Sequence, residues 1–142
     1  MADAGHAEIT VQRRIEWFDT DASGFYHNSV AFRLFEAAET VLLERLGILD
    51  DVYGRLPRVH LSADFGKLLG FADVVDTTVR VERVGNSSVE YSFLVERKGD
   101  VCVTGRAVAV LLDGPGGTKA PWSEKVRRVL TTAGVQEPQL LS

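Results

Sequence analysis

The stretch that decides the fold lies between Trp17 and Glu36 and reads WFDTDASGFYHNSVAFRLFE. Its first half has the chemistry of a turn, because Asp, Ser and Gly favour tight backbone conformations. Its second half opens a predicted helix from Ser29 to Leu46, in which the apolar residues recur every three or four positions: Ala31, Leu34, Phe35, Ala38, Val41 and Leu42. We expect Asn28 or Ser29 to cap this helix and Gly47 to end it.

Extended segments lie on both sides of this stretch. Apolar and polar residues alternate from Ile9 to Phe18, with Arg13 as the exception, which predicts a half-buried strand. Four later segments are also predicted as strands: Val59–Phe65, Val75–Glu82, Val89–Glu96 and Val101–Leu112. Turns at 85–87 and 98–100 join the last three of them. The last of these strands is apolar enough to lie centrally in a sheet, and its length is also compatible with pairing at a sheet edge.

The order of elements favours an α+β class, in which one sheet wraps around one long helix. A short helix is predicted from Ser123 to Thr132, capped by Ser123 and ended near Gly134, and a loose tail follows over 135–142. Residues 1–142 therefore read as a single domain with its core over about 8–113.

Composition limits the class of protein. A chain of 142 residues can bury a sizeable core. The net charge of -4 argues against nucleic acid as the main partner, and the single cysteine, Cys102, excludes an internal disulfide. No apolar run is long enough to span a membrane, and the N-terminus lacks the features of a secretory signal. We therefore expect a cytoplasmic protein with no membrane partner.

Two carboxylates and a histidine lie in the loop that leads into the long helix: Asp19, Asp21 and His27. The N-terminus of a helix offers unpaired N–H groups and a positive dipole end, which together stabilise an oxyanion. A nearby carboxylate can attack a carbonyl or deprotonate water, so the segment suits acyl transfer to water. Alternatively, the two aspartates only form Asx turns that shape the loop.

The segment resembles the hotdog-fold acyl-CoA thioesterases of the 4-hydroxybenzoyl-CoA thioesterase family. The resemblance rests on Asp19-Thr20-Asp21, Gly24 and the helical run Arg33-Leu34-Phe35-Glu36, and it extends over residues 8–113. It implies an antiparallel five-stranded sheet around a long central helix. It also implies an enzyme that hydrolyses acyl-CoA to a free carboxylic acid and CoA, without a metal or organic cofactor.

The resemblance assigns roles to residues of the loop and the helix. Asp21 matches the catalytic aspartate, as nucleophile or as general base, and the backbone N–H of Asn28 matches the group that polarises the thioester oxygen. Gly24 allows the backbone to approach the substrate closely, and Asp19 fixes the loop. Glu36 is the reserve catalytic candidate, because a second branch of hotdog thioesterases uses a glutamate on the helix.

Further positions are weaker candidates for substrate contact. Phe25 and Tyr26 line an acyl pocket or belong to the core, and His27 contacts substrate or bonds within the loop. His60 and Ser62 share one strand face, which borders the neighbouring subunit's active site or faces solvent. A last group falls in the hairpin region where relatives meet the CoA nucleotide: Arg83, Asn86 and Ser87.

Glu39 departs from the pattern of the family, whose members usually carry arginine at this position. It lies near the edge of the apolar arc of the helix, so burial would require a charged partner. We expect Arg45 or Arg33 to supply it.

The resemblance also implies partners and alternatives. A lone hotdog subunit leaves a sheet edge open, so the family works as homodimers or homotetramers with active sites between subunits. The first alternative function is hydrolysis of an acyl group from acyl carrier protein. The second is a non-catalytic hotdog module that binds acyl-CoA. The His-containing motifs of hotdog hydratases and dehydratases are absent from the sequence.

Overall fold

The computed structural model describes residues 4–141. Its elements follow one another in this order: β1 (Glu8–Arg14), a 3-10 turn η1 (Trp17–Asp19), α1 (Ser29–Arg45), α2 (Leu49–Val52), β2 (Arg58–Phe65), β3 (Val74–Val84), β4 (Ser88–Arg97), β5 (Asp100–Val110) and α3 (Glu124–Thr132). The predicted long helix, five strands and C-terminal helix are therefore confirmed.

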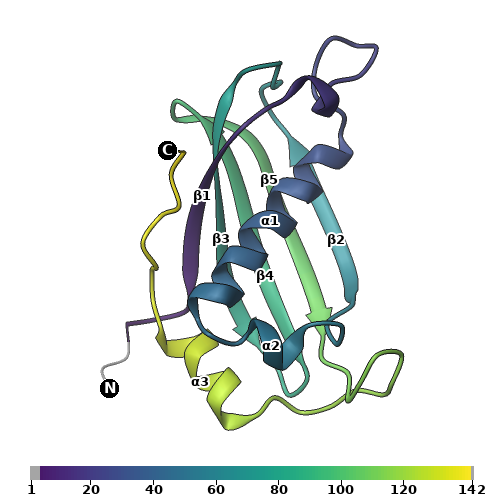
Figure 1. Ribbon diagram of the computed structural model, residues 1–142, viewed down its shortest axis with the longest axis vertical. Helices are drawn as coiled ribbons and strands as arrows, with labels where there is room; N and C mark the ends of the chain where they lie inside the picture. The colour runs from purple at the N-terminus through teal and green to yellow at the C-terminus, as the bar shows by residue number, and fades with distance from the viewer. Residues whose placement is uncertain (1–3, 142) are drawn as a thin grey trace.

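The five strands form one antiparallel sheet in the order β1-β3-β4-β5-β2, and α1 crosses one face of it (Figure 1). The α+β class and the predicted wrapping of one sheet around one helix are confirmed. β5 lies centrally, between β4 and β2, as its apolar sequence predicts. The edge position that its length would also allow is taken by β1 and β2 instead.

The core lies between α1 and the sheet. Phe35 of α1 is fully buried and contacts two aromatic residues of β4, with ring centroids 5.6 Å from Tyr91 and 4.9 Å from Phe93. α1 ends at Arg45, and Gly47, just past the cap residue Leu46, turns the chain away with a φ of 72°, the left-handed conformation that glycine tolerates best. The N–H groups of Gly47 and Ile48 bond to the carbonyls of Glu44 and Leu43, which satisfies the last turn. The predicted stop is confirmed.

The first strand is shorter than its alternation predicts. β1 ends at Arg14, and the chain turns into η1, so Trp17 and Phe18 project into solvent with 77% and 78% of their surface exposed. The reason is local hydrogen bonding: the carboxylate of Asp19 accepts a bond from the N–H of Glu16, and the N–H of Asp19 donates to the carbonyl of Glu16. These bonds replace a strand ladder with a tight turn.

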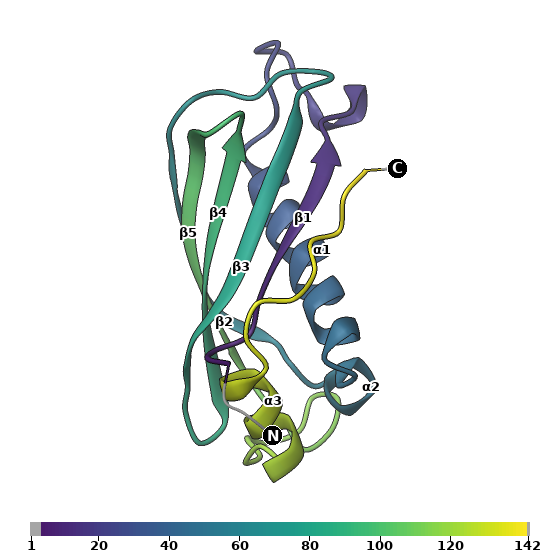
Figure 2. The ribbon, with the colours of Figure 1, turned by 90° about the vertical axis from the view of Figure 1, so that its left-hand side faces the viewer.

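The C-terminal segment is not the loose tail that the sequence predicts. After α3, it runs beside β1 (Figure 2), where the N–H of Gln139 donates to Thr10 and the N–H of Gln12 donates to Gln139. The free edge of β1 provides these partners. Residue 142, the last of the predicted tail, lies outside the described residues. Within residues 4–141 no helix combines the length and apolar character needed to cross a membrane.

Candidate active site

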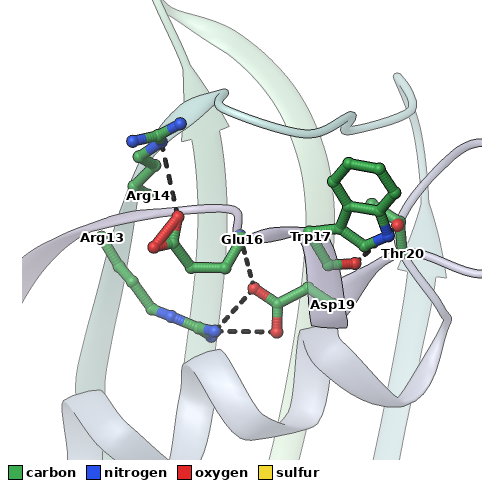
Figure 3. Close-up of polar contacts among 6 residues, drawn as sticks. All are labelled: Arg13, Arg14, Glu16, Trp17, Asp19 and Thr20. Atoms are coloured by element: carbon green, nitrogen blue, oxygen red, sulfur yellow. Dashed lines mark hydrogen bonds and ion pairs between the residues drawn. The ribbon is translucent and has the colours of Figure 1, made fainter.

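A buried ion pair holds the start of the loop between β1 and α1 (Figure 3). Asp19 is 2% exposed, and its two carboxylate oxygens accept bonds of 2.8 and 2.7 Å from one guanidinium nitrogen of Arg13. The N–H of Glu16 donates to the same carboxylate at 2.8 Å. The predicted role of Asp19 in fixing the loop is confirmed. Arg13, the exception in the strand pattern, is its partner, which sequence reasoning missed.

The loop itself is a small hairpin closed at its base by Asp19. The N–H of His27 donates to the carbonyl of Asp19 at 2.8 Å, and the N–H of Asp21 donates to the carbonyl of Phe25 at 3.0 Å. Gly24 turns the chain at the tip with a φ of 86°. Asp21 and the start of α1 therefore belong to one hydrogen-bonded unit that is anchored to β1.

Asp21 is exposed, and its carboxylate is held in one orientation. One oxygen accepts bonds from the N–H of Ser23 at 2.8 Å and from its hydroxyl at 2.6 Å. These two bonds hold the pKa of Asp21 below its ordinary value, so the side chain is a carboxylate at neutral pH. The expected Asx turn is thus present, and the second oxygen has no hydrogen-bond partner among residues 4–141.

The first turn of α1 presents an unpaired N–H group. The Asn28 side chain makes no capping bond; instead, Nδ1 of His27 accepts from the N–H of Ser29 at 3.1 Å. Asn28 therefore occupies the expected N-cap position, but the capping bond expected of its side chain is absent. The N–H groups of Val30 and Ala31 bond to the carbonyls of His27 and Asn28, whereas that of Asn28 has no acceptor in the described chain. A free N–H at the positive end of a helix can polarise a carbonyl.

The aromatic neighbours of this hairpin divide between surface and core. Phe25 is 41% exposed at the tip, whereas Tyr26 is buried and packs edge-on against Phe65 of β2. Burial, and then the charge of Cys102, raises the pKa of Tyr26 to about 12, so its hydroxyl stays neutral. His27 is exposed, and its Nδ1 is used inside the loop, where it also lies 2.8 Å from the Ser29 hydroxyl.

Glu36 and Glu39 lie further along α1, and Arg58 at the start of β2 joins them. Glu39 is buried and pairs with Arg58 at 2.5 Å, and Glu36 lies 3.8 Å from the same guanidinium. The expectation that Arg45 or Arg33 pairs with Glu39 is wrong: Arg45 donates to the carbonyl of Glu137, and Arg33 is exposed. Arg58 is far from Glu39 in sequence, and only the packing of β2 on α1 brings them together.

The remaining predicted residues lie away from the hairpin. His60 and Ser62 pair with Val108 and Arg106, so they face the side of the sheet opposite α1, where they lie 3.1 Å apart. The turn that holds Asn86 is at the other end of the molecule from the β1–α1 connection (Figure 1), and its carbonyls bond to residues before and within α3. Arg83, Asn86 and Ser87 thus do not share the Asp21 site within one subunit.

The side-chain and backbone groups of the hairpin are of the kinds that acyl transfer uses. The described residues contain no cluster of His, Cys, Asp or Glu suited to a metal ion. The hairpin carries a fixed carboxylate, which can act as nucleophile or base, and it leads into a helix terminus with a free N–H donor, which can stabilise an oxyanion.

Comparison with known proteins places this arrangement in a family. The model of the Thioesterase-like superfamily matches residues 15–130. A "Putative esterase" of Aquifex aeolicus is 26% identical over 96 residues, which are 65% of this chain and 74% of that protein. The structure of a "predicted thioesterase" from Bacillus stearothermophilus has a TM-score of 0.79 at 23% identity and covers 87% of this chain and 93% of its own. A 1,4-dihydroxy-2-naphthoyl-CoA thioesterase from Synechocystis has a TM-score of 0.77 at 17% identity, with coverages of 87% and 95%.

The sheet wrapped around a long helix defines the hotdog fold, which the chain shares with these structures. The chain belongs to the Thioesterase-like superfamily and is a thioester hydrolase.

Proposed function

We propose that the protein hydrolyses an acyl-CoA thioester to a free carboxylic acid and CoA, with Asp21 as the catalytic carboxylate. The observation that carries the proposal is the hairpin, which contains both Asp21 and the start of α1. One carboxylate oxygen of Asp21 accepts bonds from Ser23 and the other has no partner among residues 4–141, and the N–H of Asn28 has no acceptor in the described chain. The name of the Synechocystis thioesterase, which acts on a CoA thioester, supports CoA as the carrier.

Both chemical routes break the C–S bond and release CoA, as the thiol in the first route and, in the second, as the thiolate that leaves when the anhydride forms. In one, Asp21 accepts a proton from water, the water oxygen attacks the thioester carbonyl, and the C–S bond breaks as the proton passes to sulfur. In the other, Asp21 itself attacks and water then hydrolyses the resulting anhydride. In either route the N–H of Asn28 stabilises the negative oxygen of the tetrahedral intermediate.

We infer further that the protein works as a dimer built through β2. The C-terminal segment covers the edge of β1, whereas no described segment covers the edge of β2. Several apolar side chains of β2 are exposed: Val59 at 64%, Leu61 at 39% and Phe65 at 43%. An open edge strand with exposed apolar residues favours pairing with a second chain. Two such dimers could associate further into a tetramer, and sedimentation would distinguish the tetramer from the dimer by mass.

The test is release of free thiol from a panel of aromatic and aliphatic acyl-CoAs. Replacement of Asp21 by Asn should lower turnover by about a hundred- to ten-thousand-fold, because a positioned acid–base group contributes that much. Asp50→Asn, on the exposed side of α2, is the matched control and should leave turnover unchanged. Full activity of Asp21→Asn would refute the catalytic assignment, and faster cleavage of the same acyl group on acyl carrier protein would refute CoA as the carrier.

A further inference from the structure

A cavity of about 590 Å³ lies at the other end of α1 from the Asp21 hairpin, between α1, α2 and the start of β2. Its wall is largely apolar, with Leu43, Leu49, Val52, Leu56 and Leu112. Three charged residues interrupt this wall: Glu36, Glu39 and Arg58. Among the described residues, this is where buried charge meets a cavity of a size suited to an organic ligand.

The charged cluster is tightly held. The side chain of Glu39 is 8% exposed and accepts a bond from Arg58, whose guanidinium also lies 5.0 Å from the ring centroid of Phe35. The hydroxyl of Tyr91 is buried beside this carboxylate, and burial, followed by the charge of Glu39, raises the pKa of Tyr91 well above its ordinary value. Replacement of a buried ion pair by apolar residues of similar volume is often neutral or stabilising. Folding stability therefore gives no reason for charges in this wall.

The cluster presents both hydrogen-bond donors and acceptors. Burial raises the pKa of Glu39, more than the charge of Arg58 lowers it, so a further negative charge beside Glu39 would be unfavourable. Glu36 and Glu39 provide two carboxyl groups to one guanidinium, which also disfavours an anionic ligand. A hydroxyl group, which both donates and accepts, fits this set, because it can donate to a carboxyl and accept from Arg58.

The dimer proposed above connects this cavity to the reactive groups. Within one subunit, the catalytic hairpin lies at the Phe65 end of β2, where Tyr26 contacts Phe65, and the cavity lies at the Arg58 end. When two β2 strands pair antiparallel about a twofold axis, the Phe65 end of one lies beside the Arg58 end of the other. The cavity of one subunit then adjoins the Asp21 hairpin of its partner.

We propose that this cavity holds the distal part of the acyl group and that Glu39 and Arg58 select acyl groups that carry a hydroxyl there. This inference rests on the proposed acyl-CoA hydrolysis and deepens it by naming the substrate class. An acyl group without a distal hydroxyl leaves the buried charges unsolvated in the complex, and binding is weakened for that reason.

The experiment measures binding by calorimetry, using non-hydrolysable CoA thioethers in which a methylene separates the sulfur from the carbonyl. Two matched pairs, 4-hydroxyphenylacetyl with phenylacetyl and 6-hydroxyhexanoyl with hexanoyl, distinguish an aromatic from an aliphatic hydroxyl. We expect the hydroxylated member of one pair to bind at least about tenfold more tightly, the usual effect of one buried hydrogen bond. Equal binding within both pairs, or tighter binding of an adipoyl analogue, would overturn the proposal.

The double variant Glu39→Leu/Arg58→Leu removes the cluster and keeps the wall filled. Only Glu36, which is largely exposed, remains of the three charged residues, so this variant should bind the unsubstituted analogue at least as well as the original protein and lose the preference for the hydroxyl. Glu39→Gln, which keeps the volume and one bond to Arg58, should lower the preference in part and serves if the double variant does not fold. Glu44→Gln, an exposed position on the same helix, is the control. A preference that survives in both folded Glu39 variants contradicts the role of Glu39 and Arg58.

The binding readout separates this inference from the proposed function. If Asp21→Asn leaves hydrolysis unchanged while the hydroxyl preference depends on Glu39, the catalytic assignment fails and the pocket stands. If Asp21→Asn abolishes hydrolysis and no hydroxyl preference exists, the pocket assignment fails and the catalytic residue stands.

Discussion

At the residue scale, the pairing of Arg13 with Asp19 holds the Asp21 hairpin in place. Replacement of Arg13 by Met keeps the aliphatic stem and leaves a buried carboxylate without its cation, so we expect a loss of about 2–3 kcal/mol in the free energy of unfolding. Urea titration measures this loss. Arg14→Met is the control, because Arg14 and its partner Glu16 are both largely exposed, and it should cost less than about 0.5 kcal/mol. Equal losses for the two variants would contradict the anchoring role.

A second residue-scale prediction concerns the pH dependence of hydrolysis. The bonds from Ser23 lower the pKa of Asp21, which keeps the reactive carboxylate charged as the pH falls. Ser23→Ala removes the hydroxyl bond and raises the pKa of Asp21, so activity should be lost at a higher pH on the acid side than in the original protein. The profile of kcat/KM against pH measures the shift. An acid limb that stays in place would show that a different group controls it.

These residues also show what a sequence can predict of a site. Asp19, Asp21 and Gly24 lie within six positions of one another. The sequence alone therefore predicts the turn that they form and shows the spacing that resembles the thioesterase family. The sequence gives only a weak signal for the partner of Asp19, because Arg13 is no more than a polar exception in an alternating strand. The sequence gives no signal for the partner of Glu39, because Arg58 reaches it only through the packing of β2 on α1.

At the scale of elements, the packing of β5 on β4 fixes how α1 sits on the sheet. Gly105 of β5 lies opposite Phe93, and a Cβ added at Gly105 would come within 2.1 Å of the Phe93 ring, which contacts Phe35 of α1. Gly105→Ala should therefore destabilise the protein by about 1–3 kcal/mol, and Phe93→Leu in the same chain should restore part of this loss. Thermal unfolding measures both effects. Gly114→Ala, where a Cβ meets open space, should be neutral; a similar effect at both glycines would contradict the argument.

Periodicity predicted the elements well where their own residues determine them. The apolar spacing of α1 and the alternation of β3 and β4 arise within each segment, and their boundaries agree with the structure to within a few residues. The end of β1 and the course of the C-terminal segment depend on partners outside the segment. The carboxylate of Asp19 ends the strand, and the free edge of β1 orders a tail whose own sequence carries no strand pattern.

At the scale of the whole molecule, the two sheet edges differ in a way that predicts assembly. The edge of β1 is covered by the C-terminal segment (Figure 2), whereas β2 has exposed apolar side chains and no segment within residues 4–141 covers its edge. Leu61→Lys places a charge on the open edge, so we expect sedimentation to show a monomer in place of a dimer. Hydrolysis should fall in parallel, because each hairpin would lose the cavity of the neighbouring subunit.

The matched variant Leu140→Lys places the same charge on an exposed apolar residue near the other edge. Because the tail already covers β1, this variant should keep both the dimer and the activity of the original protein. A second test mixes the folded Leu61→Lys and Asp21→Asn proteins at high concentration, where mass action favours a mixed dimer. In that dimer the intact hairpin of the Leu61→Lys chain faces the intact cavity of the Asp21→Asn chain. Part of the activity should therefore return. Full activity in a monomeric Leu61→Lys protein would show that one subunit holds the complete site.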